Sequence, residues 1–176
     1  MNENIEEILS DIVRIFPVKS HDMQDGIPSV VKLATLSRAS LRNSESFDAY
    51  LYRNPYLTIS ATEYPAPSTE GPVFVEMEEN PTVKIVEQRG VSGLIYKGNI
   101  DISVVCPDAA SVSILNEWKN LGSALDYVLM TADGRLFMMR SLPGTSIFAR
   151  EENLKKEMTF SLKIEMKMKS PLIPII

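Results

Sequence analysis

The side chains best suited to chemistry are few and scattered along the chain. His21 is the only histidine, and Asp22 and Asp25 lie close to it in the sequence. Zinc sites need several histidine or cysteine ligands, and calcium loops need more oxygen ligands than HDMQDG provides. A nucleophilic site built on His21 would also need a serine or cysteine that nothing in the sequence places beside it. We therefore interpret His21 as a solvated loop residue and predict no metal site.

Two further features could carry chemistry, but each has a simpler interpretation. Cys106 is the only cysteine, so no disulfide can form within the chain. It is the last residue of a predicted strand and lies on the apolar face of that strand, which is typical of a small buried residue. Gly90 and Gly93 are too closely spaced for a phosphate-binding loop, and no suitable lysine or helix start follows them. The sequence thus predicts no catalytic residue, no cofactor and no enzyme activity.

The charge of the chain limits its partners. The formal net charge is −5, which argues against nucleic-acid binding through a basic face. From Lys155 onward there are five lysines and two glutamates, whereas no basic residue occurs between Arg53 and Lys84. This asymmetry could steer copies of the chain head to tail. Alternatively, it reflects two solvated faces of opposite sign.

The sequence has no feature of a membrane protein. No stretch of about 18 apolar residues is present, so we expect no membrane span. The first nine residues, MNENIEEIL, are acidic and do not resemble a signal or transit peptide. We expect the chain to be made and folded in a reducing cytoplasm.

The first part of the chain, 1–54, is predicted to be a short helix followed by an extended arm. Apolar residues recur at three- and four-residue steps from Ile5 to Phe16, which favours an amphipathic helix ending at Pro17. The stretch 18–50 reads as mostly irregular chain with one helical turn near 30–36. A loop of this length is unusual inside a compact domain, so it could order against a neighbouring molecule.

The middle part, 55–169, is predicted to be a β-rich core domain. Strands are expected at 56–62, 73–78, 82–87, 96–106, 127–131 and 135–142, with turns at Gly90/Gly93 and at Asp133-Gly134. Asp108 can cap a helix that extends to Gly122. From Met158 to Lys169, apolar and polar residues alternate without a break, as in a long strand with one buried and one wet face. Together these elements predict an α+β fold, mainly an antiparallel β sandwich or barrel with one helix between strands and a short N-terminal helix.

The last part, 170–176, is an apolar tail. It is a candidate interface, formed by Pro171, Leu172, Ile173, Pro174, Ile175 and Ile176. Terminal segments are usually polar, and the two prolines favour an extended conformation. The tail could fold back over its own core, or it could dock on another subunit.

The order of strand pair, helix from Asp108 to Leu121, Asp-Gly hairpin and long alternating strand from Met158 to Met168 resembles bacteriophage tail structural proteins of the tail-tube or tail-completion type. The resemblance covers roughly 55–170. It implies rings of identical subunits whose sheets line a channel, joined by termini and long loops. It also implies synthesis in the bacterial cytoplasm and a place in the virion tail, among other tail proteins.

We therefore expect a structural subunit of a phage tail or related injection-type assembly that forms homo-oligomeric rings or tubes. The contacts are expected to involve 18–50 and 170–176. The alternative is a monomeric ligand- or partner-binding β-domain without catalysis.

Overall fold

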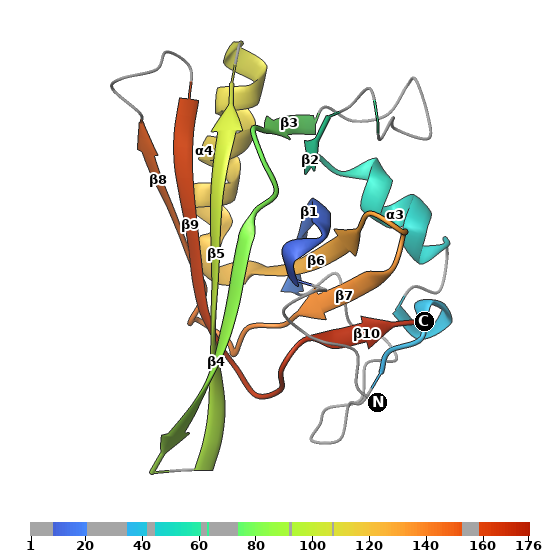
Figure 1. The fold of residues 1–176 in the computed structure, drawn as a ribbon, viewed down its shortest axis with the longest axis vertical. Coiled ribbons are helices and arrows are strands. Elements are labelled where there is room, and N and C mark those ends of the chain that lie inside the picture. The colour runs from blue at the N-terminus through green and yellow to red at the C-terminus, as the bar shows by residue number, and fades with distance from the viewer. Residues whose placement is uncertain are drawn as a thin grey trace.

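A computed structural model describes residues 9–20, 35–41, 45–60, 63, 74–91, 93–106, 108–152 and 159–176. The fold is dominated by β-strands, with helices packed on the sheet (Figure 1). The strands are β1 (Ile12–Lys19), β2 (Tyr56–Ile59), β3 (Phe74–Met77), β4 (Thr82–Gly90), β5 (Gly93–Val105), β6 (Leu125–Thr131), β7 (Leu136–Met139), β8 (Ile147–Glu152), β9 (Thr159–Met168) and β10 (Ile173–Ile175). The helices are α2 (Arg38–Leu41), α3 (Phe47–Arg53), α4 (Ala109–Leu121) and the short 3₁₀ helix η2 (Gly122–Ala124).

The described strands form one sheet in the order β10-β7-β6-β1-β2-β3-β5-β9-β8, and β4 pairs with β5. Most neighbours are antiparallel, but β2 and β3 run parallel. The predicted α+β class is therefore confirmed at that level. The sheet is mixed, and its described strands do not close into a barrel.

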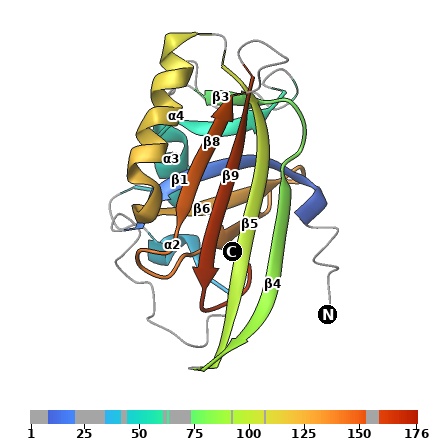
Figure 2. The same cartoon turned by 90° about the vertical axis from the view of Figure 1, so that its left-hand side faces the viewer.

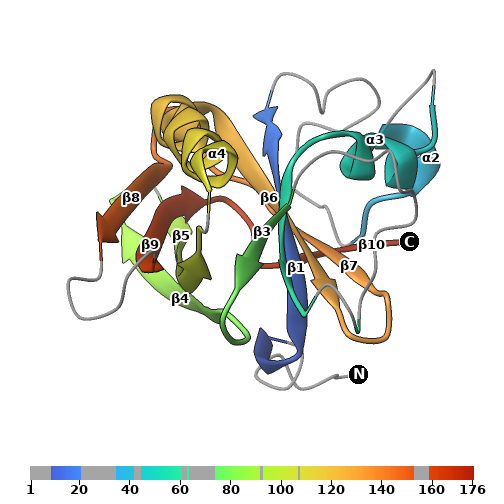
Figure 3. The ribbon, with the colours of Figure 1, turned by 90° about the horizontal axis from the view of Figure 1, so that it is seen from above.

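The sheet has two parts whose strands run in different directions. The long strands β4, β5, β9 and β8 stand upright in Figure 1, whereas β6, β7 and β10 cross the molecule. Seen from above, α4 lies in the angle between these two parts, and α2 and α3 lie on the far side of β7 (Figure 3). We call β4, β5, β9 and β8 the long layer, and β10, β7, β6 and β1 the crossing layer.

Each layer contributes to a large core between them. Alternate residues of β5 and β9 pack there with α4 and with one face of β1 and β6. The opposite face of the crossing layer forms a second core with α2 and α3. The crossing layer is consequently buried on both faces, whereas the long layer is buried on one.

The predicted N-terminal helix is wrong from Ile12 onward, although Leu9 and Ser10 are helical. Ile12–Lys19 is strand β1, which lies between β2 and β6 at the centre of the sheet. Its residues are buried on both faces, so apolar residues run almost continuously and include positions that also match a helical period. The β-branched residues Ile12, Val13, Ile15 and Val18 favour the extended conformation.

Pro17 is compatible with this central strand because β2 pairs with β1 only near Arg14 and Ile15. Within the described sheet, Pro17 is paired with Tyr127 of β6 and has no partner in β2. A proline is tolerated where a strand lacks a neighbour on one side. The proline that suggested a helix stop is therefore part of the strand.

The stretch predicted to be mostly irregular also contains regular structure. Helix α2 and the first turn of α3 lie within it, while the predicted turn near 30–36 falls largely outside the described residues. The backbone N–H of Ala49 donates to Ser46 Oγ at 3.1 Å, which caps the start of α3. Phe47, Tyr50 and Leu51 then face the second core. The first 54 residues thus supply both a central strand and a helix that covers the sheet.

Several predicted elements are confirmed. Strand β9 alternates between exposed and buried residues from Ser161 to Met168, although Thr159, which was expected on the wet face, is buried. Helix α4 starts at Asp108, whose Oδ1 accepts from the backbone N–H of Ser111 at 2.8 Å. Gly122 ends α4 but keeps a helical conformation and continues into η2. The hairpin turn between β6 and β7 contains Gly134, with φ +87°.

Strand β8 was not predicted, and it forms one edge of the long layer beside β9.

Close packing marks the point where the two layers meet. An added Cβ at Gly98 of β5 would lie 2.7 Å from the Met139 Cε of β7 and 3.0 Å from the Met168 Cε of β9. Any larger residue would therefore force these methionine side chains to shift, and glycine lets the layers pack closely without such a shift.

The apolar tail forms strand β10 at the edge of the crossing layer. Ile173 pairs with Met138 and Ile175 with Leu136 of β7, and both isoleucines are buried in the second core. The backbone N–H of Leu36 donates to the Pro174 carbonyl at 2.8 Å. In a strand, the backbone N and the carbonyl of one residue point to the same side. The Pro174 carbonyl points toward Leu36, so the missing N–H of Pro174 removes no hydrogen bond between β10 and β7. Of the two alternatives left open by the sequence, the tail packs on its own chain.

Candidate functional site

The long layer presents a polar outer face, which Figure 2 views directly. Side chains on this face form rows across the paired strands, and the register aligns Thr82 with Asp101, Asp101 with Lys163, and Lys163 with Ala149. The charged members of this row are exposed. The alternation that buries Leu162 and Ile164 on the inner side leaves a wet surface on the outer side.

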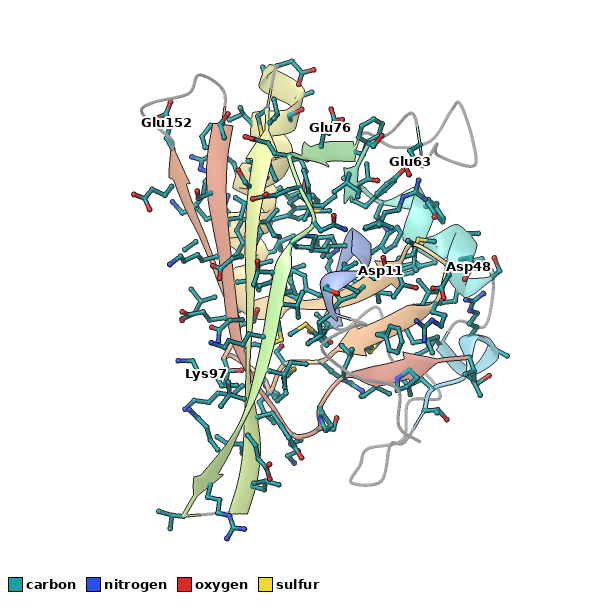
Figure 4. The ribbon with its side chains drawn as sticks, in the orientation of Figure 1. Asp11, Asp48, Glu63, Glu76, Lys97 and Glu152 are labelled. Atoms are coloured by element: carbon teal, nitrogen blue, oxygen red, sulfur yellow. The ribbon has the colours of Figure 1, made fainter. Side chains whose placement is uncertain are left out.

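One row of the outer face brings like charges together. Lys97 of β5 is paired directly with Lys167 of β9, and both are exposed. Lys97 points away from the body of the protein (Figure 4). Directly opposed like charges are unfavourable in a sheet, although exposure to solvent screens them.

Both edges of the long layer are open within the described residues. There β8 pairs only with β9, and β4 pairs only with β5. Along an antiparallel edge strand, alternate residues turn their backbone N–H and carbonyl groups outward. Each edge therefore offers a row of backbone groups to another strand.

Apolar surface accompanies each edge. Ile147 of β8 is 58% exposed. A groove of about 510 Å³ runs beside β4. Its lining consists of Leu9, Ser10, Pro81, Thr82, Val83, Lys84, Ile85 and Val86. Long edges with exposed apolar residues are sites where other chains add strands.

The β4–β5 hairpin extends beyond the rest of the long layer (Figure 1). Strand β9 ends where Met168 pairs with Tyr96, so the start of β5 pairs with β4 alone. We call this two-stranded end, with Val91 at its turn, the hairpin tip. Val91 is fully exposed and Leu94 is 43% exposed.

A shallow, open depression of about 580 Å³ lies at the other end of the long layer, beside the start of α4. We call it the α4 cavity. Its lining consists of Cys106, Asp108, Ala109, Val112, Ser113, Asn116, Glu152 and Phe160. Cys106, Val112 and Phe160 supply apolar surface, while Asp108 and Glu152 supply negative charge. Glu152 lies at the end of β8, as labelled in Figure 4.

The ionisable groups of the α4 cavity have shifted pKa values. Burial raises the pKa of the Cys106 thiol to about 11, against a smaller opposite effect of Arg150. The thiol is therefore protonated at neutral pH and is a poor nucleophile. The hydrogen bond from the Ser111 backbone lowers the pKa of Asp108, which is ionised at neutral pH. These shifts fit a packing role for Cys106 and a capping role for Asp108.

A buried arginine, which sequence reasoning did not single out, lies in β1. The Arg14 Nε donates to Thr58 Oγ1 at 3.2 Å, and Nη1 donates to the Tyr52 hydroxyl at 2.5 Å. Its guanidinium carbon also lies 5.5 Å from the ring centre of Tyr52 and 5.6 Å from that of Tyr56. These contacts join β1, β2 and α3, which indicates a structural role.

Asp126 is a second buried charged residue that the sequence did not reveal. Its Oδ1 accepts from the Ser141 backbone N–H at 2.9 Å and from Ser141 Oγ at 3.0 Å. Arg140 Nε lies 3.9 Å from Oδ2. Burial raises the pKa of Asp126, and the hydrogen bonds from Ser141 oppose that shift. This network ties β6 to the segment after β7.

The residues considered first for chemistry do not form a site in the described part of the chain. His21 lies outside the described residues. Cys106 is buried in the main core. Among the described residues there is no group of three or more histidine, cysteine, aspartate or glutamate side chains that could hold a metal ion.

The six tail residues have separate positions. Ile173 and Ile175 are 2% and 5% exposed in the core of their own chain, whereas Ile176 is 72% exposed. Leu172 packs against the main core, Pro174 is half-buried, and Pro171 is exposed. In this arrangement the two buried isoleucines are not accessible to a neighbour, and a contact of this segment with another subunit stays a prediction.

Comparisons with protein-family models, curated proteins and solved structures give no match for this chain. No helix among the described residues is long and apolar enough to cross a membrane. The geometry of the long layer is therefore the main guide to function.

Proposed function

We propose that this chain is a structural subunit of a phage virion tail or a related injection-type assembly, in which copies form a ring or tube by pairing their long layers edge to edge. The observation that carries the proposal is the pair of open edges on the long layer, β8 on one side and β4 on the other. The sequence resemblance to tail-tube and tail-completion proteins points in the same direction.

The strand directions suit repeated pairing. Each neighbouring pair in the order β8-β9-β5-β4 is antiparallel, so β8 and β4 run in opposite directions. If copies are related by rotation about an axis along the strands, β4 of one copy meets β8 of the next in antiparallel orientation. The contact uses different surfaces on the two copies, and such a contact gives a ring when the rotation closes. A closed ring also leaves no free strand edge.

Side chains at the two edges are complementary. Lys84 of β4 and Glu151 of β8 both belong to the outer face, as do Val86 and Ala149. If the outer faces of the two long layers stay on the same side, antiparallel pairing can place Lys84 of one copy opposite Glu151 of the next. The same register brings Ala149 near Val86. Exposed Ile147 then lies near the far end of β4, where it loses contact with water. The polar outer face would form one continuous wall of the ring.

The proposal is tested by the assembly state of purified protein, measured by light scattering after size-exclusion chromatography and by negative-stain electron microscopy. We expect rings of defined size. Ala149→Lys on the β8 edge should weaken self-association by roughly tenfold, because edge lysines oppose strand addition. Glu165→Lys is the matched control, since Glu165 is exposed on the same face but lies in the interior strand β9, where its β8 partner is the uncharged Ile147.

A charge exchange tests the pairing itself. Lys84→Glu and Glu151→Lys should each weaken association, and the double variant should restore it. A wild-type protein that remains monomeric at every concentration would contradict the proposal.

A further inference from the structure

We propose that the hairpin tip of one copy docks into the α4 cavity of another, so that copies stack along the direction of the long strands. The inference rests on the proposed assembly role, but it concerns a second contact, made at the ends of the long strands rather than along the lengths of β4 and β8. It assigns a partner to the two features that edge pairing leaves unused.

The hairpin tip has the properties of a docking element. Only two strands support it, because β9 ends at the Tyr96–Met168 pair. Two-stranded ribbons are marginally stable alone in water. Val91 nevertheless places an apolar side chain at the very end of the ribbon, with Leu94 beside it. Burial against a partner would remove this surface from water and fix the ribbon.

The α4 cavity has a matching composition. Val112 and Phe160 are partly buried and pack against the main core, so their apolar surface is held in place. Ala109 is small and exposed at the cavity wall. The cavity of about 580 Å³ is wide enough to admit the side chain at the end of a hairpin.

Charges favour the same contact. Arg89, which pairs with Leu94 beside the tip, is exposed and carries a positive charge. The cavity carries Asp108, held ionised by its hydrogen bond with Ser111, and Glu152. Arg150 also lies beside the cavity, with its guanidinium carbon 5.3 Å from the ring centre of Phe160, so these three groups together leave the cavity negative. The opposite signs favour contact between tip and cavity over contact between two tips.

The positions of tip and cavity make the contact repeatable. The tip lies at the beginning of β5, and Cys106 of the cavity directly follows its end. The 13 residues of β5 span about 43 Å at the usual rise of an extended strand. A shift of similar length along the strand axis brings one copy's tip to the next copy's cavity. Such a head-to-tail contact does not close on itself, so it extends as a stack.

Cysteine cross-linking tests this contact directly. The variant with Val91→Cys and Ala109→Cys places one thiol on the tip and one at the cavity wall. Mild oxidation of the full-length protein should give a ladder of covalent oligomers on a non-reducing gel, since each disulfide joins two copies. The matched control combines Val91→Cys with Lys119→Cys, because Lys119 is exposed on the same helix but does not line the cavity. Equal ladders from the two pairs would overturn the proposal.

Charge reversal separates stacking from ring formation. Arg89→Glu should shorten or abolish stacks in electron micrographs and leave single rings intact. Combining it with Asn116→Arg, which adds a positive charge to the cavity wall on α4 and leaves β8 unchanged, should restore stacking, while Lys119→Glu should have no effect. Stacks unchanged by Arg89→Glu would contradict the tip contact. If wild-type protein gave a cross-linked ladder but no rings, the edge-pairing proposal would fail while the tip contact would stand.

Discussion

The long layer and the crossing layer bury their strands in different ways. From Ser161 to Met168 of β9 every second side chain is exposed, whereas in β1 seven successive residues are buried. The difference follows from position, because α2 and α3 cover the face of the crossing layer that the main core does not. One layer is therefore free to present a polar surface to water or to other copies, and the other is fully used in holding the fold together.

The largest expected effect comes from charges placed in the two layers. In β1, Ile15→Asp and Phe16→Asp should both prevent folding, because adjacent residues face two different cores. In β9, Leu162→Asp should be equally damaging, at several kcal/mol, whereas Lys163→Glu should change the free energy of unfolding by about 0.5 kcal/mol or less. Circular dichroism would show whether each variant folds, and urea denaturation would measure its free energy of unfolding. If either β1 variant folded normally, the claim that the crossing layer is buried on both faces, unlike the long layer, would be wrong.

The tail tests whether the crossing layer depends on its edge strand. Ile173→Ala should lower the free energy of unfolding by about 2–4 kcal/mol, because it leaves a cavity in the second core. Truncation after Ser170 should lower the melting temperature further. Ile176→Ala is the control, and its mostly exposed side chain should contribute little. A truncated protein that melts normally but fails to assemble would instead favour docking of the tail on another subunit.

A smaller effect is expected from Asp126, the buried carboxylate of the crossing layer. Its pKa is raised in the folded state, so ionisation disfavours folding, and stability from this group is lost as pH rises through its folded pKa. Asp126→Asn removes this dependence. The stability of wild type relative to the variant should therefore fall as pH increases from about 3 to about 7. Urea denaturation across this range measures the difference, and an opposite slope would mean that the hydrogen bonds from Ser141 outweigh burial.

The sequence predicted the long layer far better than the crossing layer. Strict alternation in β9 identifies a strand and its two faces, and the Asp108 cap identifies the start of α4. In β1 the same local reasoning failed, because a strand buried on both faces has no alternation and its apolar run also fits a helix. The tail was ambiguous for a related reason. Whether Ile173 and Ile175 pack on β7 or on a neighbour depends on contacts distant in sequence.

The candidate site was only partly predictable. The Gly90/Gly93 turn was expected, but the projection of the tip depends on where β9 ends relative to β5. The α4 cavity forms because Cys106, Glu152 and Phe160 come from three different strands or their ends. Capping signals for α3 at Ser46 were present, with Asp48 in the first turn and Arg53 in the last, and could have revealed that helix.

The close approach at Gly98 also has a consequence for oxidation chemistry. Met139, Met166 and Met168 surround this glycine and are almost fully buried. Peroxide converts accessible methionines to sulfoxides, which are polar and pack poorly in an apolar core. These three sulfur atoms should resist oxidation while the two layers stay in contact and react once the layers separate. The oxidation state of these methionines therefore reports whether the two layers have separated.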